Sequence, residues 1–141
     1  MAQPDDEAVP QPSAAPVHEP VGNPYLAMIL AWIVPGLGHI YLRRIGRGAA
    51  FLLLVLVSLW VGCELQGNLY RPIPGQPLTN LATVGAMGMG LPYFWLRYGA
   101  DYAGDIMSAG YEYGTAFLLT AGLMNWLLVL DAWDISRGKK E

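Results

Sequence analysis

The chain has 141 residues, of which 54% are apolar and 13% are charged, and its net charge is −3. The charged share is about half of that in soluble globular domains, and a net charge this small, with only one basic cluster, excludes nucleic acid as an expected partner. Lys, Arg, Asp and Glu are missing from four stretches, residues 25–42, 49–63, 78–96 and 114–130. Each stretch approaches the ~20 residues with which an α-helix crosses the bilayer. Four fully buried helices of a soluble protein would lack polar faces to cover them.

These stretches predict an all-α fold, a helical integral membrane protein with about four transmembrane helices. Residues 1–22 contain five prolines and four acidic side chains, so we expect them to be a disordered tail. Their acidic start differs from the basic start of a secretory signal. The first apolar segment is therefore expected to be an uncleaved anchor in a bacterial inner (plasma) membrane.

Residues 23–65 predict a helical membrane hairpin. The Asn23-Pro24 pair has the residue types of a helix N-cap and a first helical position. The first helix should cover residues 25–42, with a kink at Pro35, whose ring removes one backbone hydrogen bond. The second helix should cover about 45–65, with much of its surface facing lipid.

The turn of this hairpin contains His39 and three arginines. We expect Arg43, Arg44 and Arg47 to contact lipid headgroups or to set the topology. His39 has no further metal ligand at a coordinating spacing, so no metal or haem site is predicted. It should hydrogen-bond backbone groups freed by Pro35 and the glycines, or lie at headgroup level. The alternative is a contact that responds to protonation.

Seven residues of the turn form a glycine-histidine-tyrosine motif: Pro35, Gly36, Gly38, His39, Tyr41, Gly46 and Gly48. The motif resembles the two-transmembrane (TM-two) domain family, although Leu42 stands where a glycine is usual and Ile40 replaces an aromatic residue. With residues 121–125 and 130–134, the chain is also similar to an uncharacterised bacterial family of small polytopic membrane proteins. Neither resemblance implies an activity or a cofactor.

A turn-rich loop over residues 66–77 precedes a second predicted helix pair, residues 78–137. Its first helix, about 78–98, has small residues four apart at Ala82, Ala86 and Gly90, a spacing that lets membrane helices approach closely. Its second helix, about 114–133, has a small and polar stripe that should face the first. This stripe includes Gly114, Gly122 and Asn125, and we expect the Asn125 amide to hydrogen-bond another helix.

The two helices of this pair are separated by residues 97–113, in which acidic residues and tyrosines recur on opposite sides. This pattern is typical of an amphipathic helix in the membrane interface, and a solvated loop is the alternative. Residues 138–141 should form a solvated tail. Counting Lys and Arg for four spans gives four on each side, so the positive-inside rule returns a tie. If the helix over 78–98 were re-entrant, the count would be six against two.

The sequence predicts a structural or interaction role, as an accessory subunit of a membrane complex. Its expected partners are membrane lipids and other membrane subunits or a second copy. The alternative is a small oligomeric channel or transporter lined by the third and fourth helices, with Asn125 and Glu112 facing the pore. No enzyme is predicted, because Ser58, Ser108 and His39 lack the glycine-flanked elbow of a hydrolase nucleophile.

Overall fold

A computed structural model describes residues 22–139 of the chain, so the predicted disorder of residues 1–21 lies outside the described residues. Every regular element in this part is a helix, which confirms the all-α class. The elements are α1 (Pro24–Ile33), α2 (Leu37–Tyr41), α3 (Ile45–Glu64), α4 (Pro77–Met87), α5 (Leu91–Phe94), the π-helix η1 (Trp95–Gly99) and α6 (Tyr111–Ser136).

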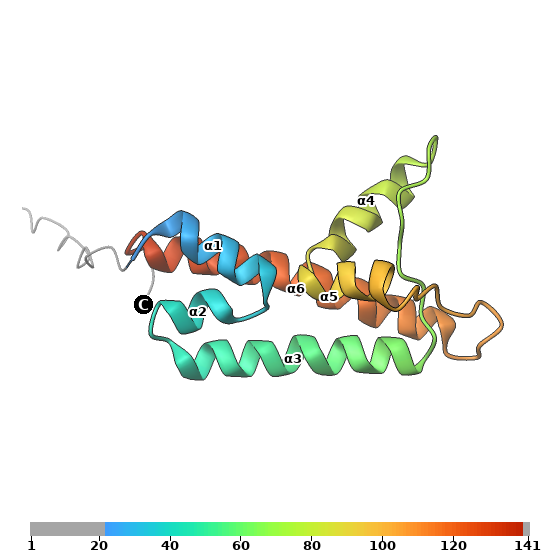
Figure 1. Cartoon of the computed structure of the whole chain (residues 1–141), viewed down its shortest axis with the longest axis horizontal. Helices are drawn as coiled ribbons and strands as arrows, with labels where there is room; N and C mark the ends of the chain where they lie inside the picture. The colour runs from blue at the N-terminus through green and yellow to red at the C-terminus, as the bar shows by residue number, and fades with distance from the viewer. Residues whose placement is uncertain (1–21, 140–141) are drawn as a thin grey trace, which may run out of the picture.

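Helices α3 and α6 form the frame of the molecule and run side by side in opposite directions (Figure 1). At 1.5 Å per residue their 20 and 26 residues span about 30 and 39 Å. These are the two helices within residues 22–139 that are long and apolar enough to cross a membrane, where four were predicted. Only 17% of the apolar window of α3 is buried inside the molecule. Most of its apolar surface therefore faces outward, unlike a core helix of a soluble protein.

The prediction of one kinked helix over residues 25–42 is wrong, because the chain reverses inside it. Helix α1 ends at Ile33 and α2 begins at Leu37. Between them Pro35 has no N–H to continue the helix. Gly36 adopts a φ of 81°, a backbone angle that residues other than glycine rarely adopt. Helix α2 then runs back along α1, and we call the α1–α2 unit the first hairpin (Figure 1).

Close backbone packing explains the glycines of this hairpin. A Cβ atom on Gly36 would collide with the carbonyl oxygen of Gly48, and one on Gly38 would lie 2.7 Å from the Cβ of Ala31. These glycines let α2 fit between α1 and α3. At the start of α1, the Asn23 side chain accepts a hydrogen bond from the Tyr25 N–H at 3.0 Å, as predicted for an N-cap.

The predicted helix over residues 78–98 is also broken. Helix α4 ends at Met87, and residues 88–90 form a buried turn in which Gly90 has a φ of 69°. The chain then returns through α5 and η1, and we call this unit the second hairpin. In Figure 1 α4 leans away from the frame at its start and approaches α6 at its end. The two hairpins enter the bundle from opposite ends of the frame.

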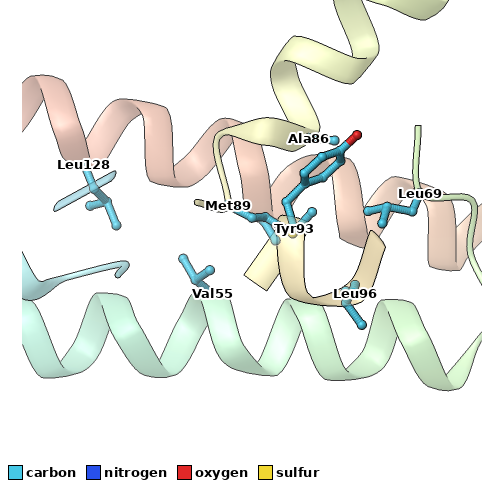
Figure 2. Close-up of a cluster of buried hydrophobic side chains, with 8 residues drawn as sticks. Val55, Leu69, Ala86, Met89, Tyr93, Leu96 and Leu128 are labelled. Carbon is cyan, nitrogen blue, oxygen red and sulfur yellow. The ribbon is translucent and has the colours of Figure 1, made fainter. Parts of the chain in front are cut away.

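Side chains of the second hairpin form the main hydrophobic core together with α3 and α6 (Figure 2). Met89 and Tyr93 are buried in the same cluster as Val55 of α3, and the Tyr93 hydroxyl donates a hydrogen bond to the Tyr70 carbonyl at 2.9 Å. The core therefore holds the break of the second hairpin inside the protein.

Residues 100–110 form turns and loop, so the interfacial helix predicted over 97–113 is absent and the alternative of a loop is observed. This loop is attached to the end of α3. The Tyr102 hydroxyl donates a hydrogen bond to the Gly67 carbonyl at 3.0 Å, and the Asp105 N–H donates one to the Gln66 carbonyl at 3.0 Å. Burial, with a smaller contribution from nearby Cys63, raises the pKa of Tyr102 to about 12.

Candidate functional site

The tips of the two hairpins meet at Asn125, a fully buried residue in the middle of α6. Its Nδ2 donates hydrogen bonds to the carbonyls of Gly88 at 2.8 Å, Ala31 at 3.2 Å and Trp32 at 3.4 Å. In a continuous helix the Ala31 carbonyl would accept from the N–H of residue 35, but that residue is Pro35. The Asn125 amide therefore satisfies a carbonyl that the break leaves without a backbone donor.

We call Ala31, Trp32, Gly88, Gly90 and Asn125 the central junction. A Cβ atom on Gly90 would overlap the Trp32 carbonyl oxygen, so the two hairpin tips are in direct contact. The Trp32 indole N–H also donates a hydrogen bond from the first hairpin to the Met87 carbonyl at 3.2 Å. The Asn125 Nδ2 and the Trp32 indole N–H thus donate to backbone of the chain itself, whereas the buried Oδ1 of Asn125 has no hydrogen-bond partner among the described residues.

A second polar contact inside the bundle joins His39 of α2 to Asp131 of α6. His39 is fully buried, and its Nε2 lies 3.0 Å from Oδ2 of Asp131, whose side chain is 26% exposed. The His39 ring also packs edge-on against Phe51, with ring centroids 5.3 Å apart. The structure therefore places His39 beside a carboxylate, not beside the backbone near Pro35, and Asn125 takes the role that we had predicted for His39.

The sequence does not reveal the partnership with Asp131, because this residue ends an apolar segment, where a carboxylate can also reach into water. The sequence does contain a general indication of a partner, because a charged group among apolar helices is energetically costly unless it is paired. Asp131 also lines an apolar cavity of about 440 Å³ between α3 and α6, together with Asp134 and Phe51. Among residues 22–139 no group of three or more His, Cys, Asp or Glu side chains could hold a metal ion.

The predicted small-residue faces occupy three different places. Ala86 packs on Gly122, where an added Cβ would lie 2.9 Å from the Ala86 Cα atom, so this pair lets α4 approach α6 closely. Gly90 lies at the central junction. Gly114 contacts Gly67 beyond the end of α3, where its added Cβ would lie 2.6 Å from the Gly67 nitrogen.

An apolar groove of about 700 Å³ separates the outer part of α4 from α6. We call it the α4–α6 groove. It is lined by Tyr70, Leu78, Leu81, Ala82, Val84, Gly85, Leu119, Leu123 and Trp126. Leu78 and Leu81 are 78% and 68% exposed. The groove is therefore an open apolar surface and not a closed cavity.

The three arginines of the predicted headgroup contact surround the turn between α2 and α3. Arg43 and Arg47 are exposed and Arg44 is half-buried. Arg43 adopts a φ of 61°, which closes the turn. Gly46 of the predicted hairpin motif has no atom within 4 Å of an added Cβ, so close packing does not explain it.

Together these features define a small helical bundle with two helices of crossing length and two shorter hairpins that meet at a buried amide. Residues 26–141 match the model of a family of unknown function (DUF6677), and the chain belongs to this family. No curated protein and no solved structure matches the chain.

Proposed function

We propose that the protein is a multi-pass membrane protein with a structural or interaction role, as an accessory subunit of a complex in the bacterial inner membrane. The outward-facing apolar surface of α3 supports a membrane setting, because Leu53, Trp60 and other large apolar side chains there are more than half exposed. We also propose that the segment 27–65 is related to two-transmembrane domains and that the protein is bacterial.

The α4–α6 groove is the observation that supports an interaction role. Its large apolar walls and its small residues Ala82 and Gly85 suit the close approach of another apolar helix. The Asn125 Nδ2 of the central junction, by contrast, donates its hydrogen bonds to the protein's own backbone. We propose that a transmembrane helix of a partner subunit, or of a second copy, lies in this groove.

Photo-crosslinking tests this proposal. A photoreactive amino acid at Leu81, inside the groove, should give one discrete protein adduct in native membranes, identified by mass spectrometry. Ala82→Trp should fill the groove and abolish the adduct. The matched control is the same photoreactive amino acid at Leu54, an exposed position on α3, where lipid adducts should dominate. Lipid adducts alone at Leu81 would overturn the proposal.

A second candidate, a small carrier, is favoured by one observation. Broken helices that enter from opposite sides and meet inside the bundle are characteristic of several transporter folds. The structural role predicts that purified protein in liposomes carries no proton or sodium flux above that of empty liposomes. A flux that disappears in His39→Phe, in protein that still folds, would favour the carrier instead.

A further inference from the structure

The lengths of the hairpin helices differ from the length needed to cross a bilayer. Helices α1 and α4 have 10 and 11 residues and span about 15 and 16 Å, half of the ~30 Å hydrocarbon core. Helix α1 begins beside the end of α6, where the Tyr25 and Trp133 rings lie 5.3 Å apart, and it ends beside Asn125 at the middle of α6. Each hairpin therefore penetrates only to the middle of the frame.

Both hairpins return to the end from which they entered. In the first, the Asn23 N–H near the start of α1 faces the Tyr41 hydroxyl at the end of α2, at 3.5 Å. In the second, the return through η1 leads to Tyr102, which is hydrogen-bonded to Gly67 just beyond α3. Figure 1 shows the same path, with the start of α1, the turn before α3 and the end of α6 at one end of the molecule.

Irregular backbone at membrane depth requires cover by protein, and both breaks have it. Pro35 and Gly36 of the first break are buried, as are residues 88–90 of the second. The Asn125 amide donates to the Ala31 and Gly88 carbonyls, whose helical donors would be the N–H groups of positions 35 and 92, both of which are prolines. The fold therefore meets the physical condition for two re-entrant hairpins inside a bilayer.

This path changes the distribution of positive charge. Seven Lys and Arg residues lie between positions 22 and 139, and five of them belong to the α2–α3 turn, the start of α3 or the end of α6: Arg43, Arg44, Arg47, Arg137 and Lys139. Figure 1 shows these segments at one end of the molecule. The other two are Arg71, in the loop after α3, and Arg97, in η1, segments on the side of the opposite end. Over these same seven residues, the four-span count of four against three becomes five against two, and positive residues that flank short loops face the cytoplasm.

We propose that the chain crosses the membrane only twice, through α3 and α6, with two re-entrant hairpins that meet at mid-depth. Its basic end is the surface that contacts anionic phospholipid headgroups of the cytoplasmic leaflet. The aromatic side chains Tyr25 and Trp133 stand at this end, at the depth where such rings anchor in the interface, and the Arg137 guanidinium lies 5.4 Å from the Trp133 ring centroid. This proposal rests on the proposed membrane setting.

Single cysteines in a Cys63→Ala background, probed with a membrane-impermeant maleimide, test the topology. The positions are Ser13, Gly46, Ala103 and Lys139. In inside-out vesicles we expect labelling at 13, 46 and 139, and in intact spheroplasts labelling at 103 only. Gly46 suits the test because nothing lies within 4 Å of an added Cβ, and Ala103 and Lys139 are exposed.

Each competing topology gives a different result. Four spans would place 46 and 103 together, opposite 13 and 139. Three spans would place 46 and 139 together, opposite 13 and 103. Either pattern, or the expected grouping in the reverse orientation, would overturn the proposal. Failure of the membrane setting itself is distinguishable, because the protein would then be released by alkaline carbonate and all four positions would respond alike within each preparation, with no division between the two.

Discussion

A single amide at Asn125 satisfies backbone carbonyls from two hairpins that are far apart in the sequence. Its replacement by Leu should lower the free energy of unfolding by about 1–3 kcal/mol, because the buried Ala31 and Gly88 carbonyls would lose a donor. Asn125→Asp should cost more, since its carboxyl oxygens would face those carbonyl oxygens. The measurement is thermal unfolding in detergent.

The matched control for these variants is Thr120→Leu, an exposed polar position on the same helix. It should leave the unfolding temperature unchanged. An Asn125→Leu protein as stable as the parent would show that the junction does not depend on this amide.

The contact between His39 and Asp131 should be energetically coupled, because removal of either partner leaves the other in a poorly solvated place. In a double-mutant cycle with His39→Phe and Asp131→Leu, we expect a coupling energy of about 1–3 kcal/mol. The comparison is the pair Arg97 and Asp101, 3.9 Å apart, whose carboxylate is 99% exposed and which should show no measurable coupling. Additive effects at His39 and Asp131 would contradict the prediction.

Tyr102 should make the protein sensitive to alkali. Because burial raises its pKa in the folded state to about 12, above the ordinary value near 10, the folded state holds this proton more tightly than the unfolded state. The stabilisation is complete below pH 10 and declines between pH 10 and 12. In Tyr102→Phe the unfolding temperature should depend less on pH over this interval. Tyr113→Phe, at an exposed position, should keep the pH dependence of the parent.

At the scale of the elements, the turn of the second hairpin depends on Gly90. Ala at this position would need a φ of 69° and would overlap the Trp32 carbonyl, so we expect a loss of more than about 2 kcal/mol or a failure to accumulate. Gly75→Ala separates the two causes, because Gly75 has a φ of 82° with open space around it. It should cost only the backbone strain of about 1–2 kcal/mol. Thermal unfolding of both variants measures the difference.

Helices α3 and α6 could be predicted from the sequence almost to their ends, because long uncharged runs without internal proline have no competing structure. The hairpins could not. An apolar run with Pro35 inside it is compatible with a kink as well as with a reversal. Whether the chain kinks or reverses at this point depends on Asn125, a hydrogen-bond partner 94 residues further along the chain.

The contact of His39 was unpredictable for the same reason, since Asp131 lies 92 residues away. The amphipathic pattern over 97–113 was misleading in a different way. Its tyrosines recur at helical spacing, but Tyr102 is used to attach a loop to Gly67. Tyr98 and Tyr113, which share that spacing, are 76% and 71% exposed, so periodicity identified neither the buried residues nor the backbone conformation here.

At the scale of the whole molecule, the distribution of arginines should determine orientation. The triple variant Arg43→Gln, Arg44→Gln, Arg47→Gln removes the positive charges of the short loop before α3, so the bias between the two ends falls. We expect external maleimide to label a fraction of the Gly46→Cys molecules, whereas the parent should show none. Arg71→Gln, which removes a charge at the opposite end, should leave the labelling one-sided.

The long sequence separation within the central junction also has a consequence for assembly during synthesis. The carbonyl at the end of α1 is made early, but the amide that satisfies it emerges from the ribosome 94 residues later. Until α6 has been translated, the break at Pro35 would expose unpaired backbone to lipid, which is strongly disfavoured. In the proposed topology the first hairpin therefore remains near the membrane surface until α6 is made, and its entry into the bilayer is expected among the last steps of biogenesis.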